Sequence, residues 1–331
     1  MLEKLSGKAL SARFKPVGQR LPPTDPATLG PSQAGLVYLD VSAPRRQDLP
    51  RELVHRISLS YPEAPLPGVT PASLTETVGR VKVSSRPVPV VAPPLTGPGW
   101  ISSNGCCSEI KSHRGDTLAV NQKLDIPQRY AIDFEQVDQS GVFYTGAADK
   151  LENWAGFGAP VTAVAGGTVV EAVDGLPEQK PLKPPSALPL AEYAGNHVVQ
   201  KFQQQGHTFY ALYAHLKTGS VKALGLRPGQ KITAGQKLGL LGNTGNSVAP
   251  HLHFHIMATP QPLATENLPY TFTSLTLTAR TPSGDALFDA LEQGTPIAST
   301  PVTPPQTHRN QLPMSVDILT FPTPPPARTT P

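Results

Sequence analysis

The chain has 331 residues, with 28 Lys and Arg against 24 Asp and Glu, so its formal charge is only +4. The basic residues are scattered and do not gather on one predicted helix face or among aromatic residues, which argues against a nucleic-acid-binding protein. Proline interrupts both helices and interior strands, so 39 prolines beside 28 glycines predict a mainly β protein of short strands, many turns and little helix.

Cysteine usage and the N-terminal sequence bear on where such a protein works. Its two cysteines, Cys106 and Cys107, are adjacent, and adjacent cysteines bridge each other only in a strained ring, so we expect no disulfide framework. Two small buried residues at a strand end are the expected alternative. No apolar run has the length of a signal peptide or of a membrane span. The sequence therefore predicts a soluble, leaderless chain without a transmembrane segment, and we expect a monomer.

The N-terminal third divides into two segments. Residues 1–34 are polar and rich in proline, glycine and basic residues, so we expect a disordered leader. Residues 35–96 are expected to form a β module, because apolar and polar residues alternate over 35–42, 52–61 and 78–85.

A proline-rich connector at 86–99 marks a boundary, and we place a separate domain at 97–262. Its sequence has longer strand patterns separated by glycine turns. These patterns cover 160–175, 196–202, 208–216, 230–247 and 250–257. The segment 176–195 interrupts them and is expected to be a surface loop.

The C-terminal segment 263–322 has two further strand patterns, at 270–280 and 315–321, separated by a short helical stretch at 285–294. These strands resemble the N-terminal set in length and pattern, so we expect the two sets to pair in a β-sandwich-like accessory module. Residues 323–331 are expected to be a disordered tail.

Three histidines lie on one face of the strand predicted at 250–257. His251, His253 and His255 alternate with three apolar residues, so their side chains point to one face while the apolar residues face a core. Adjacent imidazoles on that face are expected roughly 7 Å apart, too far for a mutual hydrogen bond but suitable for lining one cleft. A wet face with incidental histidines is the structural alternative.

Two other strand patterns carry chemistry-bearing residues. His215 ends a strand, and alternation places the apolar Leu212, Ala214 and Leu216 on the opposite face. Asp133 lies between Ile132 and Phe134, and an acid inside such a strand needs a partner, for which a metal is the usual choice in a His-rich protein.

The order of these blocks resembles the lysostaphin-type, LytM-like family of zinc metallopeptidases. The resemblance covers 100–260 and is carried most specifically by YAHL at 213–216 and by GNTGNSVAPHLHF at 242–254. It implies a duplicated hybrid motif fold built on an antiparallel sheet, and a Zn²⁺-dependent endopeptidase. The substrates it implies are peptidoglycan cross-bridge or stem peptides, or similar peptides rich in glycine or alanine. An extracytoplasmic location, in the periplasm or cell envelope, is expected from the family.

Carried over residue by residue, the resemblance makes Asp133 and His253 zinc ligands. His215 and His251 would polarise the attacking water and stabilise the oxyanion. The family has a further ligand, a histidine four residues before the aspartate, but here that position is Arg129, and an arginine cannot ligate zinc.

His113 is the expected replacement for the missing ligand, because it lies in the segment that leads into the Asp133 strand. His197, His255 and the Cys106/Cys107 pair are the alternatives. His255 also stands where the family usually has an acid.

Two other functions compete with an active endopeptidase. A catalytically degenerate relative would bind wall peptide or regulate a cell-wall hydrolase, and the arginine at a ligand position favours it. The turn at 163–169, AVAGGTV, also resembles a biotinyl- or lipoyl-carrier hairpin. Those carriers present a lysine at the turn, and this turn has none.

Overall fold

A computed structural model describes residues 3–17, 27–30, 32–106, 113–120 and 122–323. The chain divides into two compact units, Met1–Pro87 and Val88–Pro331. Strands predominate in both and the helices are few and short, so the expected mainly β, antiparallel fold class is confirmed. No helix in the described part of the chain is long and apolar enough to cross a membrane. Apart from its first residue, the expected disordered tail at 323–331 lies outside the described residues.

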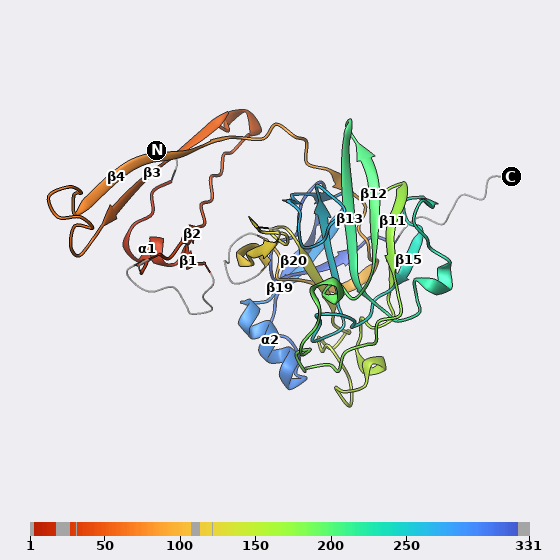
Figure 1. Ribbon diagram of the computed structural model, residues 1–331. Helices are drawn as coiled ribbons and strands as arrows, with labels where there is room; N and C mark the ends of the chain where they lie inside the picture. The colour runs from red at the N-terminus through yellow and green to blue at the C-terminus, as the bar shows by residue number, and fades with distance from the viewer. Residues whose placement is uncertain (1–2, 18–26, 31, 107–112, 121, 324–331) are drawn as a thin grey trace. The chain divides into compact units, whose positions relative to one another are not determined.

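The first unit consists of a short helix and two antiparallel ladders (Figure 1). Helix α1 (Gly7–Ser11) precedes β1 (Phe14–Pro16), which pairs with β2 (Gly35–Val37). The second ladder is the hairpin of β3 (Glu52–Ser60) and β4 (Ser73–Lys82). The predicted leader therefore contains a helix and a strand, because its apolar residues dock locally: Phe14 is buried, and an added Cβ on Gly35 would meet the Phe14 ring.

The second unit is built around an eleven-stranded sheet in which all described neighbours are antiparallel. In order across the sheet the strands are β14 (Lys231–Ile232), β11 (Gly167–Val173), β12 (Asn196–Gln204), β13 (His207–Leu216), β16 (Leu252–Met257), β9 (Ile132–Gln136), β6 (Gly97–Ser103), β21 (Asp317–Phe321), β19 (Leu275–Arg280) and β20 (Thr300–His308), with β17 (Asn267–Leu268) paired to β16. Shorter ladders join β10 (Pro160–Thr162) to β15 (Lys237–Leu240), β18 (Thr271–Phe272) to β5 (Val90–Val91), and β7 (Leu118–Val120) to β8 (Lys123–Asp125).

One face of the central strands packs into the main core. Strand period two sends Leu252, Phe254 and Ile256 of β16 to this face, where all three are fully buried, as the sequence predicts. Ile132 and Phe134 of β9 lie opposite them in register and join the same core. The residues between these positions therefore face the other side of the sheet, where the candidate site lies.

The C-terminal strands do not pair with the N-terminal β module among the described residues, which corrects the expected accessory sandwich. Instead β21 pairs with β6, and β19 pairs with β21, so both strands extend the main sheet. The physical reason is that Leu319 and Phe321 alternate toward the same core as Phe134, and the Phe134 and Phe321 rings meet edge to face at 5.5 Å.

Strand β20 escaped prediction because its sequence, TPVTPPQTH, contains three prolines. A proline cannot donate to a sheet ladder, which is tolerated at an edge. The strand lies at the end of the sheet and pairs only with β19 among the described strands. The helical stretch predicted at 285–294 is α2 (Gly284–Gln293), whose N-cap Ser283 accepts a hydrogen bond from the Ala286 amide and whose C-cap Gly294 has φ 63°.

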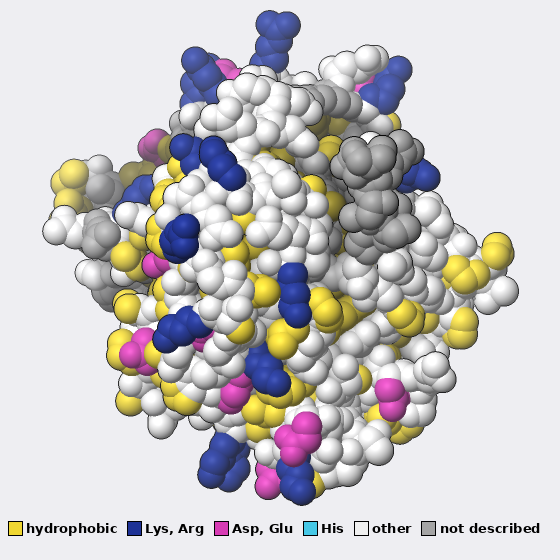
Figure 2. Space-filling view, turned by 90° about the vertical axis from the view of Figure 1, so that its right-hand side faces the viewer, with side chains coloured by type: hydrophobic (Ala, Val, Ile, Leu, Met, Phe, Trp, Pro, Cys, Tyr) yellow, Lys and Arg dark blue, Asp and Glu magenta, His cyan; other side chains and the backbone are white. Residues whose placement is uncertain are grey.

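The charged side chains of the described residues are dispersed. On the face shown in Figure 2, Lys and Arg side chains stand singly among neutral and acidic ones. This face therefore presents no continuous basic surface among the described residues.

Two glycines allow the loop after β15 to approach the start of β12. Gly195 has φ 60° and Gly245 has φ 74°. An added Cβ on Gly195 would collide with the Thr244 carbonyl oxygen, and one on Gly245 would collide with the Gly195 amide nitrogen. This close backbone approach fixes Thr244, whose carbonyl oxygen contacts a histidine of the candidate site.

Gly195→Ala should lower the free energy of unfolding of the second unit by about 2 kcal/mol or more, because both the left-handed backbone and the collision oppose it. Gly229→Ala is the control, since Gly229 has φ 86° but an added Cβ there meets nothing within 4 Å, and it should lose only about 1 kcal/mol. Both tryptophans, Trp100 and Trp154, are buried in the second unit, so urea unfolding followed by tryptophan fluorescence reports on this unit. Equal losses in the two variants would contradict the role of the close approach.

Candidate metal centre

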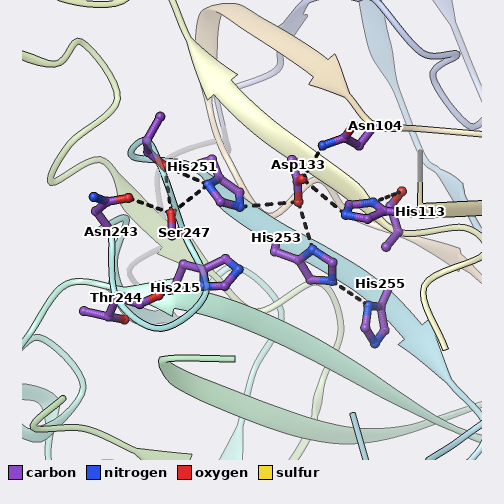
Figure 3. A network of polar contacts seen from close by, with 12 residues as sticks. Asn104, His113, Asp133, His215, Asn243, Thr244, Ser247, His251, His253 and His255 are labelled. Carbon is purple, nitrogen blue, oxygen red and sulfur yellow. Dashed lines mark hydrogen bonds and ion pairs between the residues drawn. The ribbon is translucent and has the colours of Figure 1, made fainter. Parts of the chain in front are cut away.

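The register of two central strands places an acid opposite a histidine. β9 and β16 are antiparallel neighbours, and Asp133 is the direct partner of His253. The His253 Nδ1 atom lies 2.8 Å from the Asp133 Oδ1 atom (Figure 3), and both side chains are buried. Both residues face away from the main core, as the alternation of each strand requires.

His113 reaches the same carboxylate from a separate segment. It lies in the short 3-10 segment η2 (His113–Gly115), and its Nε2 atom is 3.3 Å from Asp133 Oδ2. Its Nδ1 atom donates a hydrogen bond to the Ala131 carbonyl oxygen at 3.2 Å. Candidate ligand atoms of His113, Asp133 and His253 all lie within 4.8 Å of one another. The structure thus brings together the three residues that the sequence analysis selected as metal ligands.

The other residues considered for the third ligand lie elsewhere. Arg129 is exposed in the turn before β9. His197 lies on β12 and has its Nε2 atom near Glu171. Cys106 is buried after β6 and is disulfide-bonded, which corrects the expectation of two unbridged cysteines, and Cys107 lies outside the described residues. None of these belongs to the three-residue group that the described residues form around Asp133.

His251 approaches the opposite side of the carboxylate. Its Nε2 atom is 3.4 Å from Asp133 Oδ1, and its Nδ1 atom lies 2.8 Å from the Ala249 carbonyl oxygen. A carbonyl oxygen can only accept, so Nδ1 carries a hydrogen and Nε2 faces the site. The Ser247 hydroxyl lies 3.2 Å from the same Nδ1 atom. The ring orientation is therefore fixed by the loop that precedes β16.

His215 reaches the site through an irregular backbone. Its φ is 62°, an uncommon value for a residue other than glycine, and the β12–β13 register shifts opposite it, between Asn196 and Val198. Leu212 and Ala214 pair with His255 and His253, so they lie on the site face rather than opposite it, which corrects the predicted alternation. The bulge returns His215 to that face one residue after Ala214.

Hydrogen bonds hold the His215 backbone and ring. Its amide donates to the Ala194 carbonyl oxygen at 3.0 Å, and its Nδ1 atom donates to the Thr244 carbonyl oxygen at 2.7 Å. The His215 and His251 ring centroids are 4.6 Å apart. Since Nδ1 is committed to Thr244, the Nε2 atom is the one that faces the site.

The prediction that neighbouring imidazoles on β16 cannot bond to each other is wrong. His253 Nε2 lies 2.9 Å from His255 Nδ1, and the two rings are nearly perpendicular at 87°. The strand spacing separates the backbones, but a side chain can lean along the strand and close that distance. His255 consequently contacts the candidate ligand His253 rather than Asp133.

The buried groups around Asp133 perturb each other's protonation. Burial raises the pKa of Asp133, but the charges of His113 and His251 and their hydrogen bonds outweigh it and hold the pKa well below its ordinary value. Burial lowers the pKa of His251, but the charge of Asp133 and the hydrogen bond to it outweigh burial and raise the pKa to about 9. Burial also lowers the pKa of His113, but the charge of Asp133 and the hydrogen bond to it outweigh burial and raise that pKa.

The pKa values of the remaining histidines of the site are lowered. Burial, together with the charges of His251 and His253, holds the pKa of His215 well below its ordinary value. The pKa of His253 is lowered mainly by burial, and that of His255 is lowered further by burial and the charge of His253. His215 is therefore neutral near pH 7 while His251 is protonated in the metal-free protein.

Two residues that the sequence analysis missed also contact the centre. Asn104 donates a hydrogen bond from Nδ2 to Asp133 Oδ2 at 2.8 Å. Glu135 lines the same cleft, and burial raises its pKa to about 7 despite the charge of His251. Glu135 follows Asp133 by two residues, so strand alternation could have identified it. Asn104 lies far from Asp133 in the sequence, and no sequence pattern indicated that it contacts the site.

A cleft of about 500 Å³ opens onto these side chains. Besides the histidines, its lining includes Tyr193 and Ala194 from the segment before β12, and Leu287 and Phe288 from α2. The cleft is thus bounded on different sides by segments from several parts of the chain, which gives an extended ligand access to the centre.

Comparison with known proteins matches residues 153–265 to the model of peptidase family M23. The peptidoglycan DD-endopeptidase ShyA of Vibrio cholerae is 42% identical over 71 residues, which are 22% of this chain and 15% of that protein. An uncharacterized metalloprotease of Haemophilus influenzae is 36% identical over 89 residues, 26% of this chain and 17% of that protein. The matches thus span less than a fifth of either relative.

The catalytic domain of lysostaphin from Staphylococcus simulans aligns structurally with 52% of this chain and 86% of that domain, at 21% identity and a TM-score of 0.26. Residues 153–265 therefore correspond to a peptidase family M23 domain. The family match includes His215, His251 and His253 and begins after Asp133.

Asp133→Asn should lower the pKa of His251 from about 9 in the metal-free protein, because the negative charge that raises it is removed while burial remains. The protonated form of His251 should consequently be lost at lower pH in the variant. Titration of the imidazole resonances by NMR measures this shift. Asp149→Asn, which removes an exposed carboxylate, should leave the titration unchanged, and an unchanged His251 in Asp133→Asn would contradict the assigned pairing.

Proposed function

We propose that this M23 domain is a zinc-dependent endopeptidase that hydrolyses peptidoglycan cross-bridge or stem peptides with water as the nucleophile. The observation that carries the proposal is the convergence of His113, Asp133 and His253 on one buried point, with His215 and His251 beside them in the same cleft.

The donor set fits zinc. Two imidazoles and one carboxylate are a common protein ligand set of catalytic zinc sites, which keep a further position open. The buried Asp133 carboxylate is surrounded by three imidazoles, so a divalent cation can replace the protons that otherwise balance its charge. When bound, zinc lowers the pKa of water and polarises the carbonyl group of the peptide bond.

His215 is suited to accept a proton. Its Nδ1–H group is committed to the Thr244 carbonyl oxygen, so its Nε2 atom presents a lone pair to the cleft. Burial and neighbouring charges depress its pKa and keep the ring neutral. A neutral imidazole positioned in this way acts as the general base for the attacking water.

His251 is suited to donate a hydrogen bond or a proton. Its Nδ1–H group bonds to the Ala249 carbonyl oxygen, so its Nε2 atom is the one that faces the cleft and can carry a proton there. An N–H group directed into the cleft can stabilise the oxyanion of the tetrahedral intermediate and can return a proton to the leaving amine. The two histidines, each with its Nδ1 atom committed to a backbone carbonyl oxygen, thus divide the base and acid roles.

The peptidoglycan substrate is proposed from the relatives. ShyA is described as a peptidoglycan DD-endopeptidase, and its match covers 22% of this chain and 15% of that protein. An extracytoplasmic location follows if the substrate is correct.

The zinc content of variants should distinguish the metal ligands from the other residues. His113→Ala, Asp133→Ala and His253→Ala should each lose zinc when the protein competes with a chelator, because each removes one of three protein donors. His207→Ala, at the start of β13, is the matched control and should keep one zinc per chain. Elemental analysis after dialysis measures the stoichiometry. A full equivalent of zinc in His113→Ala would remove that residue from the ligand set.

His215→Ala and His251→Ala should retain zinc but lose about a hundredfold or more in turnover, the scale of a lost general base or oxyanion donor. Cleavage of purified peptidoglycan or of a glycine-rich peptide, measured beside zinc content, tests the division. Loss of zinc from either variant would reassign it as a ligand. A zinc-loaded wild-type protein that cleaves neither substrate would favour the catalytically degenerate, regulatory function instead.

A further inference from the structure

A second cavity adjoins the catalytic cleft. It has a volume of about 460 Å³ and shares Ala194, Pro262 and Leu263 with the lining of the cleft. Its lining also includes Glu171 of β11 and His197 of β12. The two cavities are therefore neighbours.

The sheet face between the two cavities is apolar. Leu212 and Ala214 of β13 lie beside His255 and His253, and Val199 of β12 pairs with Leu212. These three residues and Met257 form one buried cluster on the site face. The site face of β12 and β13 is therefore aliphatic next to His253 and His255.

Two residues that line the second cavity, His197 and Glu171, carry hydrogen-bond acceptors. The His197 ring is only 4% exposed, and its Nδ1 atom donates to the Gly195 carbonyl oxygen at 2.7 Å. In the tautomer that donates from Nδ1, the Nε2 atom presents a lone pair. Among the described residues this buried Nε2 atom has no hydrogen-bond partner. The nearest carboxylate oxygen, Glu171 Oε2, is 3.6 Å away, beyond hydrogen-bond distance.

The walls of the second cavity are mostly aliphatic. Leu190, Ala191 and Ala194 come from the segment that interrupts the sheet between β11 and β12, and 260–264 contributes two prolines, a leucine and an alanine. The Glu171 side chain is 46% exposed, so its carboxylate is accessible from the cavity. A long methylene chain with a cationic end matches this lining, because the chain contacts apolar walls while its end meets the acceptors.

We propose that this second cavity is a substrate subsite that binds a residue of the peptide carrying a free primary ammonium group on an aliphatic side chain. The ammonium group donates hydrogen bonds to the Glu171 carboxylate and to His197 Nε2. The methylene chain lies against the apolar residues of the segment between β11 and β12 and against residues 260–264. This inference rests on the proposed endopeptidase function, since it assigns a substrate feature to the same cleft. The alternative is a purely structural ion pair between protonated His197 and Glu171.

Matched peptides test the subsite. One peptide carries a lysine-type residue with a free side-chain amine, and the other is identical except that the amine is acetylated, which removes the charge and keeps the chain. Zinc-loaded wild-type protein should cleave the free-amine peptide with a kcat/KM about tenfold or more above that of the acetylated one, the scale of a charge-assisted hydrogen bond.

Glu171→Gln should bring that ratio close to one, because the amide removes the negative charge that distinguishes the two peptides. Asp149→Asn is the charge-matched control, because it neutralises an exposed carboxylate that lines neither cavity, and it should keep the wild-type ratio. Equal rates for the two peptides in the wild type, or an unchanged ratio in Glu171→Gln, would overturn the subsite and favour the structural ion pair.

Calorimetric titration of both peptides into zinc-loaded protein keeps this test separate from the proposed function. If neither peptide is cleaved, the endopeptidase function fails, but tighter binding of the free-amine peptide that depends on Glu171 still supports the subsite. Equal affinities for the two peptides would reject it whether or not cleavage occurs.

Discussion

The Asp133 carboxylate lies buried on β9, directly opposite His253 of β16, and imidazoles from two further segments approach it. A buried charge is costly unless it is paired, so the carboxylate requires all of these partners at once. The register of two strands, the η2 segment that carries His113 and the loop that orients His251 are therefore coupled through one group. Because its buried charge must be balanced, the carboxylate can bind a divalent cation, which can replace the protons on the surrounding rings.

The acid and base properties of the cleft depend on backbone carbonyl groups as much as on neighbouring charges. The Thr244 carbonyl fixes the tautomer of His215, and the Ala249 carbonyl fixes that of His251. The left-handed backbone of His215 is an unfavourable conformation that its amide and ring hydrogen bonds maintain. Gly195 and Gly245 permit the close approach that holds Thr244 in position. Local strain and glycine placement thus serve the orientation of one imidazole ring.

The cleft draws on segments outside the family match at 153–265. His113 and Asp133 precede that match, and α2 follows it, yet the cleft includes all three. Within the match, the segment between β11 and β12 supplies apolar wall residues to the second cavity. The histidines inside the match carry the proposed reaction, and the wall residues carry the proposed selection of peptides.

The sequence alone determined the strand pattern of the central domain, the faces of β16, and the placement of His251, His253 and Asp133 on one side, because period-two alternation is local. It could not determine that β19 and β21 join the main sheet, since strand partners are chosen by long-range packing around Phe134 and Phe321. Alternation also misplaced Leu212 and Ala214, because the bulge at His215 is a property of the β12–β13 pair. His113 was selected by its position in the chain, but only the tertiary structure brings its Nε2 atom to Asp133. Distances between side chains from separate elements follow from packing, which no single segment encodes.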